Sequence, residues 1–400
     1  MKRLTTDSAS RTARHNAVPL ALCAIGLVTV GLPWLTHKAN RLAEGDALRL
    51  WAFSGAAGPI SLTLLWLTAL AASLTGRGRK ATTIWGLASA LLLIVAPLVA
   101  GLGAGDLRAG GDGMERVSLG PGFWVAIVSA YLLVFAARRR LEDGPWRKAV
   151  ITWLAPVGLT ILLLTGNLSE LSIMQELVSQ QGRFLQEVGR HCYISGISVG
   201  LGVVIGVPLG VWASRNPTVS RVIFTITNTA QTIPALALFG LLMAPLALLT
   251  GALPSLKAIG IRSIGFTPAI VALTAYSLLP IVRNTHAGLG HIDEGVIEVG
   301  KGMGMKSWEV FLRVETPLAA PLVVSGIRTA AVQTVGNAVL AALIGAGGLG
   351  FFVFKGLGET APDLILLGAL PTIALALLTD SALRMLNTLV TPRGLQVEGR

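Results

Sequence analysis

Polar residues at helical spacing inside two strongly apolar stretches are the side chains best suited to a chemical role. Thr329, Gln333 and Asn337 follow one another at intervals of four residues, which places them on one face of a helix. The polar positions of the second stretch are Asn228, Gln231 and Thr232. A polar group is costly in lipid and tends to face a cavity or another helix. The two stripes therefore indicate either a water-filled path or hydrogen bonding between helices, and the sequence leaves both open.

Two charged residues accompany these stripes. Arg328 lies about ten residues into its apolar stretch, so it either extends toward the nearer membrane surface or pairs with another side chain. Asp380 is the acidic residue placed well inside an apolar stretch. Neither has the neighbouring carboxylates or His residues that a membrane-embedded enzyme places in pairs.

The most distinctive polar segment runs from His291 to Pro317. Helical patches flank a glycine-rich corner, and we expect a positive φ at Gly304, where a Cβ would resist the turn. The residues that define this segment are Glu298, Gly300, Gly304, Trp308 and Pro317. An ordinary amphipathic surface helix is the alternative interpretation. Because the segment is longer than the neighbouring loops, we interpret it as a docking element.

Glycines form two further patterns. Gly345, Gly347, Gly348 and Gly350 fit G-x-G-x-x-G, but a dinucleotide site needs this pattern between a strand and a helix. Here it closes an apolar helix, so we expect a flexible hinge. A second set of glycines recurs in the stretch 192–213, where a missing side chain lets another helix approach closely. These are Gly196, Gly200, Gly202, Gly206 and Gly210. Packing within one subunit is the favoured interpretation for them, and a subunit interface is the alternative.

Several kinds of chemistry leave no trace in the sequence. There is no phosphate-binding loop, nucleophile motif or acid–base pair, which predicts a chain that is not an enzyme and has no catalytic residues. Cys23, Cys192 and the five His lack metal-ligand spacing, so we expect no metal, no bound cofactor and no disulfide framework.

The composition identifies lipid as the solvent of most of the chain. Hydrophobic residues make up 53% of the 400 residues and charged residues 13%, whereas soluble domains are about 25% charged. The net charge of +12 comes from basic residues in short loops between apolar runs, so nucleic acid is not expected as a partner.

Apolar runs of spanning length predict an all-α polytopic membrane protein with about ten transmembrane helices. The predicted spans are 17–36, 51–75, 81–104, 122–137, 149–165, 192–213, 221–249, 266–284, 318–345 and 364–388. Segment 221–249 is longer than one membrane thickness and contains Pro234. We favour one tilted, kinked span over two short ones.

Loop charge predicts the orientation. In the first half, polar segments 1–16, 76–80 and 138–148 carry Lys and Arg about three times as densely as the alternate segments, which places the amino terminus in the cytoplasm. If 221–249 crosses once, segment 285–317 is also cytoplasmic.

The predicted organisation has four parts. An amino-terminal membrane extension of five spans covers 1–165, and 166–190 is a periplasmic amphipathic connector. A membrane core covers 191–390 and contains the cytoplasmic loop 285–317. A cytoplasmic tail covers 391–400.

At the segment that begins with Glu298, the chain resembles the membrane subunits of binding-protein-dependent ABC importers. Their signature is E-A-A, three residues, Gly, nine residues and I-x-L-P. Glu298-Val299-Gly300, Gly304 and Val314-Glu315-Thr316-Pro317 fit its spacing, with Val299 and Gly300 replacing the two Ala, Val314 replacing Ile and Thr316 replacing Leu. Further stretches resemble the branch that takes up glycine betaine, choline and related osmoprotectants. They are 231–237, 276–284, 326–329 and 341–350.

The resemblance covers about 186–390 and implies a five-helix type I permease core. It implies a multi-pass subunit of the bacterial inner membrane, with both termini cytoplasmic, that moves an osmoprotectant without binding ATP. ATP and Mg²⁺ would belong to a cytoplasmic ATPase dimer that docks on loop 285–317. A second permease subunit, identical or paralogous, and a periplasmic binding protein would complete the importer. Tyr276 and Arg328 join the candidate path residues on this basis.

Alternatives remain at this point. An importer of the same architecture for methionine, phosphonate or sulfonate is one, and a self-sufficient secondary transporter or channel is another. The solute, the identity of the second subunit and the role of residues 1–165 stay open.

Overall fold

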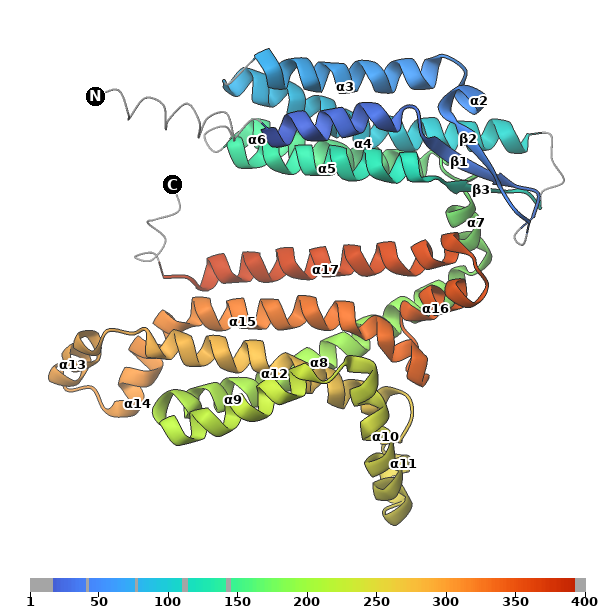
Figure 1. Cartoon of the computed structure of the whole chain (residues 1–400). Coiled ribbons are helices and arrows are strands. Elements are labelled where there is room, and N and C mark those ends of the chain that lie inside the picture. The colour runs from blue at the N-terminus through green and yellow to red at the C-terminus, as the bar shows by residue number, and fades with distance from the viewer. Residues whose placement is uncertain (1–16, 41–42, 76–77, 110–113, 142–144, 393–400) are drawn as a thin grey trace, which may run out of the picture. The chain divides into compact units, whose positions relative to one another are not determined.

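The computed structural model describes residues 17–40, 43–75, 78–109, 114–141 and 145–392 (Figure 1). The chain divides into two compact units, Met1–Ser179 and Gln180–Arg400, which are described separately. Their boundary lies within the predicted connector 166–190. The predicted basic segment 1–16 and most of the predicted tail 391–400 lie outside the described residues.

Six helices of the first unit lie within or close to the five spans predicted for it. The first covers Ala17–Thr29. The others are α2 (Leu50–Ser54), α3 (Ala57–Thr75), α4 (Arg79–Arg108), α5 (Pro121–Arg140) and α6 (Pro145–Leu164), with the short α7 (Ser172–Ser179) after them. Predicted span 51–75 is broken between α2 and α3, where Gly55 has a positive φ of 54°.

The first predicted span, 17–36, was wrong at its carboxyl end. The helix stops at Thr29, and Pro33 begins strand β1 (Pro33–Lys38). Proline removes a backbone donor and favours a helix end just before it. Trp34 then points inward, fully buried, and its Nε1 donates to the carbonyl of Thr29 at 2.7 Å.

Strand β1 is the centre of a three-stranded antiparallel sheet that the sequence did not predict. Its partners are β2 (Asp46–Arg49) and β3 (Arg116–Leu119), in the order β2-β1-β3. Leu35 pairs with Leu48 on one side and with Leu119 on the other. The strands are too short and too near the ends of apolar runs for their period to be recognised.

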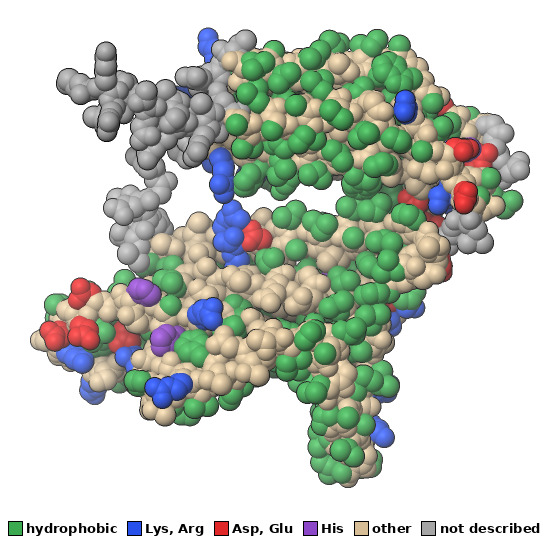
Figure 2. Space-filling view, in the orientation of Figure 1, with side chains coloured by type: hydrophobic (Ala, Val, Ile, Leu, Met, Phe, Trp, Pro, Cys, Tyr) green, Lys and Arg blue, Asp and Glu red, His purple; other side chains and the backbone are tan. Residues whose placement is uncertain are grey.

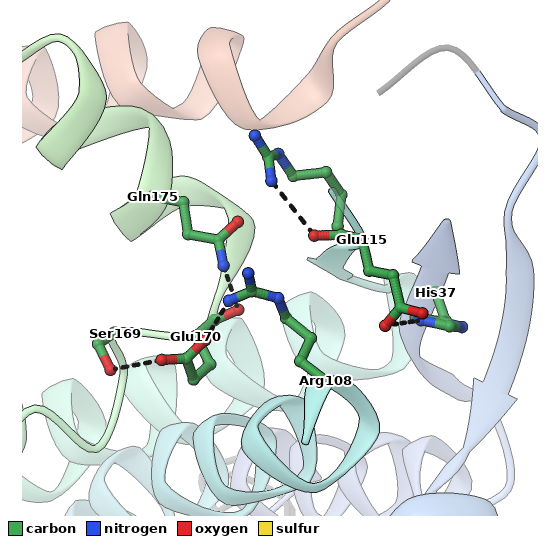
Figure 3. Close-up of polar contacts among 7 residues, drawn as sticks. His37, Arg108, Glu115, Ser169, Glu170 and Gln175 are labelled. Atoms are coloured by element: carbon green, nitrogen blue, oxygen red, sulfur yellow. Dashed lines mark hydrogen bonds and ion pairs between the residues drawn. The ribbon is translucent and has the colours of Figure 1, made fainter. Parts of the chain in front are cut away.

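Polar contacts hold the loops at the sheet end of this unit (Figure 3). Arg108 at the end of α4 pairs with Glu170, and Gln175 of α7 donates to the Glu170 carbonyl at 3.4 Å. His37 of β1 lies 3.2 Å from the Glu115 carboxylate.

All regular secondary structure in the described residues of the second unit is helical. Its main helices are α8 (Gln181–Arg215), α9 (Pro217–Thr232), α10 (Ala235–Ala252), α12 (Phe266–Gly290), α15 (Thr316–Asn337) and α17 (Pro362–Val390). Short elements connect them: α11 (Ser255–Ala258), α13 (Glu294–Gly302), α14 (Ser307–Val310), the π-helix η1 (Phe311–Glu315), the 3₁₀ helix η2 (Ala338–Ile344) and α16 (Gly350–Gly358).

Helix α12 packs against both α8 and α15, and α17 packs against α15. Three glycines of α8 allow this close approach, because a Cβ on Gly202, Gly206 or Gly210 would meet Ser277, Ile281 or Thr285 of α12. The packing interpretation is therefore confirmed for these three positions. A Cβ on Gly196 or Gly200 would meet no atom within 4 Å.

Segment 221–249 is broken, not kinked as we expected. Ile233 and Pro234 are both extended, with ψ of 127° and 139°, so α9 ends and α10 leaves in a new direction (Figure 1). Between Arg215 and Phe266 the chain passes along the unit once, in α9. Helices α10 and α11 project from it, and the chain returns where the Gly265 N–H donates to the Ile344 carbonyl at 2.9 Å.

In the described part of the chain, nine helices are long and apolar enough to cross a membrane. Hydrophobic side chains cover the flanks of the helices in Figure 2, and charged side chains gather toward their ends. The prediction of a predominantly helical polytopic membrane protein is confirmed, with the small sheet as an addition to it.

Candidate coupling segment and transport path

The segment between α12 and α15 forms a projecting unit of short helices (Figure 1). Asp293 caps the start of helix α13, and its Oδ1 accepts from the Gly295 N–H at 2.7 Å. An aspartate at this position satisfies an otherwise unpaired amide of the first turn. Glu298 lies in the second turn and is exposed. Its carboxylate is therefore free to meet another molecule.

The corner after α13 depends on glycine. Gly304 has a φ of 86°, as the sequence predicted, and a Cβ there would meet no atom within 4 Å. Gly300 is buried, and its Cβ would touch Val310 at 3.4 Å. Trp308 of α14 is 58% exposed. Pro317 lies in the first turn of α15. Glu298, Gly304, Trp308 and Pro317 are exposed and together make a partly apolar surface, whereas Gly300 packs beneath it.

An ion pair attaches this projecting segment to α8. Arg215, the last residue of α8, donates to the carboxylate of Glu315, which is 4% exposed. The Arg215 guanidinium also lies 5.8 Å from the centre of the Phe311 ring. Phe311 and Glu315 bound the π-helix η1, an element often found at functional positions.

A pocket of about 480 Å³ opens between α8 and this segment. Its lining comes from both elements, namely Val211 and Arg215 with Ile297, Lys301, Ser307, Trp308, Val310, Phe311 and Glu315. Basic, acidic and aromatic side chains thus surround one depression at the projecting end of the unit.

The polar stripe of α15 is partly unpartnered in this structure. Thr329 and Gln333 are exposed, and Asn337 is half-buried at the end of the helix. Thr329 donates only to its own helix, to the Ser325 carbonyl at 3.0 Å. An exposed polar stripe on an apolar helix fits a face that meets water or a second subunit.

The polar residues of α9 have structural partners. Gln231 donates to the Tyr276 carbonyl at 2.8 Å, and the buried Tyr276 hydroxyl donates to the Ile233 carbonyl. These two bonds hold the break between α9 and α10. Asn228 accepts from Arg283 at 3.2 Å, and Thr232 bonds within α9 to the Thr229 carbonyl. The structure thus brings Gln231 and Tyr276 together, and Tyr276 shares a buried cluster with Ala338, the residue after Asn337.

Arg328 pairs with another side chain, one of the two outcomes considered for it. Its Nε lies 2.5 Å from Oδ1 of Asp380 on α17, and Arg384 binds the other carboxylate oxygen at 2.5 Å. The pair neutralises two charges within helices of spanning length and joins α15 to α17.

The glycine string from Gly345 to Gly350 forms a tightly held corner between η2 and α16. Gly345, Gly347 and Gly348 have positive φ values of 76°, 77° and 88°, and a Cβ on Gly350 would collide with the Val339 carbonyl. In this structure the glycines permit close packing. Their proposed role as a hinge stays a prediction.

Sequence reasoning missed the side chains that hold this corner. Glu187 and His191 of α8 are both fully buried and contact Gly348 and Leu349. They fell inside or beside the predicted connector 166–190, because Arg183, Glu187 and Arg190 made it look solvent-exposed. The spacing of these three charges along one helix was the available signal. Arg183 and Arg190 both pair with Glu187, and helix α8 already begins at Gln181 instead of near 192.

Among the described residues, no group of His, Cys, Asp or Glu has the arrangement to hold a metal ion.

Comparisons with known proteins match both units. Residues 14–174 match the N-terminal domain of the ABC transporter permease YehY, and residues 202–392 match the family of binding-protein-dependent transport system inner membrane components. The chain is 39% identical over 224 residues to the glycine betaine/carnitine/choline transport system permease protein OpuCB of Bacillus subtilis, covering 56% of this chain and 96% of that protein.

Two further matches each cover about half of the chain. The osmoprotectant import permease protein OsmW of Salmonella typhimurium is 40% identical over 207 residues, which cover 52% of this chain and 91% of OsmW. A chain of the MetNI methionine ABC transporter, solved in inward-facing conformations, matches with a TM-score of 0.46 and 24% identity, covering 52% of this chain and 96% of that one.

Proposed function

This chain belongs to the family of inner-membrane components of binding-protein-dependent transport systems, and from that premise we propose that it is the membrane-spanning subunit of an ATP-driven osmoprotectant importer. Glycine betaine, carnitine and choline are the proposed solutes. The names of OpuCB and OsmW support this class, because both relatives are about 40% identical to this chain over slightly more than half of its length.

The projecting segment α13–η1 is the observation that supports ATP-driven transport most directly. It presents Glu298 and Trp308 to solvent, and Gly304 fixes the corner between them. We propose that a cytoplasmic ATPase docks here, one ATPase on each of two permease subunits. The ATPase, with its ATP and Mg²⁺, is a separate chain, and this chain carries out no hydrolysis.

The direction of α12 and α15 supports the orientation. Both helices meet the projecting segment at the same end of the unit (Figure 1). Since α9 makes the one passage between α8 and α12, the basic-loop argument places this end in the cytoplasm. The corner at Gly345–Gly350 then faces the periplasm, where a solute-loaded binding protein would arrive.

The path is proposed to run along α15, between this subunit and a second one. Thr329 and Gln333 are exposed there, and Asn337 lies at the periplasmic end. Three contacts would support the walls of the path. Gln231 bonds to Tyr276 of α12, Tyr276 bonds to Ile233, and Arg328 pairs with Asp380. The second subunit is a second copy or a paralogue of this chain.

Uptake of labelled glycine betaine tests the proposal. Cells that lack their own osmoprotectant uptake would express this chain with its ATPase and its binding protein. We expect uptake of labelled glycine betaine that is lowered by unlabelled choline or carnitine but not by methionine. Competition by methionine alone would instead favour an amino-acid importer, and uptake without any ATPase would favour a secondary transporter.

A further inference from the structure

Two fully buried side chains at the periplasmic end of α8 have no role in the transport path described above. Glu187 has three partners. It forms an ion pair with Arg183 Nε at 2.7 Å, and it accepts hydrogen bonds from Arg190 Nη1 at 3.0 Å and from the Gly348 N–H at 2.6 Å. A buried carboxylate is tolerated only when it is paired in this way. The Gly348 partner belongs to a segment 161 residues further along the chain.

His191, one turn further along α8, holds the same corner from both sides. Its Nε2 lies 3.0 Å from the Val335 carbonyl, and its Nδ1 accepts from the Leu349 N–H at 3.3 Å. Both contacts are satisfied at once by a neutral ring with its proton on Nε2. His191 therefore ties the end of α15 and the start of α16 to α8, with η2 between them.

The glycines of the corner are shaped to these two side chains. A Cβ on Gly347 would lie 2.7 Å from Glu187 Oε2, and one on Gly348 would lie 3.2 Å from His191 Nδ1. Both glycines also have positive φ. Side chains at these positions would push the corner away from α8, so the backbone reaches the two buried groups only because it carries none.

Helices α8 and α15 are thus fastened together at both ends. At the periplasmic corner His191 bonds to Val335 of α15, and Glu187 holds Gly348, which follows α15 and η2. At the other end Arg215 and Glu315 join α8 to η1, which continues directly into α15. Two helices fixed to each other at both ends move as one body. A displacement of the projecting segment then reaches the periplasmic corner without being absorbed by sliding between α8 and α15.

We propose that Glu187 and His191 act together as a latch, which holds the periplasmic corner to α8. The latch couples movement of the cytoplasmic segment to that corner. Glu187 and His191 are positioning residues and do not contact the solute. The proposal rests on the proposed ATP-driven transport. It predicts that a broken latch leaves ATP hydrolysis intact but makes it unproductive.

Hydrogen exchange of the assembled transporter tests the latch itself. The peptide that covers 345–352 is measured in wild type, Glu187→Gln, His191→Gln and Gly347→Ala, with the peptide covering 294–305 as internal reference. We expect faster exchange at 345–352 in all three variants and unchanged exchange at 294–305. Gly347→Ala keeps both latch side chains, so it tests the same contact even if Glu187→Gln fails to assemble. The matched control is Gly358→Ala at the carboxyl end of α16, where a Cβ would meet no atom within 4 Å, and we expect wild-type exchange at 345–352 in this variant.

Coupling is measured on the same proteins in liposomes as glycine betaine transported per ATP hydrolysed. We expect this ratio to fall about tenfold in the latch variants, a typical size for a coupling between sites, while ATP hydrolysis continues. A purely structural role would lower transport and hydrolysis together. Unchanged exchange, or faster exchange with a wild-type ratio, would overturn the latch.

Failure of the proposed function is distinguishable from failure of the latch. If wild type transports no glycine betaine, the proposed solute is wrong. The latch then stands if the variants exchange faster and their ATP hydrolysis no longer responds to the binding protein, and it falls if either remains as in wild type.

Discussion

Arg215, the last residue of α8, and Glu315, the last residue of η1, form an ion pair between positions 100 residues apart. The Glu315 side chain is 6% exposed and that of Arg215 is 50% exposed. Glu315 thus depends on Arg215 more than Arg215 depends on Glu315, because only the carboxylate has lost most of its water.

Arg215→Ala is therefore expected to destabilise the protein. It leaves a buried carboxylate without this partner, and we expect the free energy of unfolding to fall by about 1–3 kcal/mol. Thermal unfolding in detergent measures the change. The exchanged pair Arg215→Glu with Glu315→Arg should recover part of the loss. If the double variant loses as much free energy of unfolding as its two single changes lose in sum, the pairing itself contributes nothing to stability.

The break between α9 and α10 gives a second stability prediction. Tyr276→Phe removes the hydroxyl that donates to the Ile233 carbonyl, and we expect a loss of about 1 kcal/mol, the usual net contribution of one hydrogen bond. Thermal unfolding is again the measurement, with Tyr131→Phe on an exposed position of α5 as the control. Equal stability of the Tyr276 variant and wild type would mean that this bond does not hold the break.

The proposed path predicts a loss of transport without a loss of assembly. Replacing both Gln333 and Asn337 with Leu makes the α15 stripe apolar where a solute would need hydrogen bonds. We expect reduced uptake while the ATPase still co-purifies. Thr388→Val near the end of α17 is a polar-to-apolar control. Wild-type uptake in the double variant would show that these two residues do not line the path.

Topology is tested by single cysteines in a chain lacking Cys23 and Cys192. Both test positions, Ser179 and Ser307, are exposed. An impermeant thiol reagent should label a cysteine at Ser179 in intact spheroplasts and one at Ser307 only after lysis. Labelling of Ser307 from outside would reverse the proposed orientation and remove the docking role of α13 and α14.

Periodic features of the sequence predicted most of the fold. Features that depend on contacts between distant parts of the chain could not be recognised in the sequence. Long apolar runs located most helices, and glycines spaced along α8 correctly indicated packing against α12. Strand β1 was read as the end of a helix, because Trp34 and Leu35 are as apolar as the span before them. Its pairing partners lie far along the chain, and no local pattern identifies them.

The candidate site was predictable to a similar extent. The φ of Gly304 followed from the signature spacing. The pairing of Arg328 was one of two outcomes that the cost of a charge in lipid left open. Glu187 and His191 were missed, because their partner is the backbone of a distant loop. A charged residue next to a polar connector resembles a solvated one until the fold buries it.

Gly304→Arg tests the central claim, that the segment from α13 to η1 couples ATP hydrolysis to transport through this chain. The substitution places bulk and charge at a position with a φ of 86°, whereas Glu298→Ala removes one exposed carboxylate worth about 0–1 kcal/mol. The measurement is ATP-dependent glycine betaine uptake, with ATPase pull-down at equal membrane abundance. The account predicts that Gly304→Arg inserts normally but loses uptake, and that Glu298→Ala has a milder effect. Wild-type uptake by the Gly304→Arg variant would contradict it.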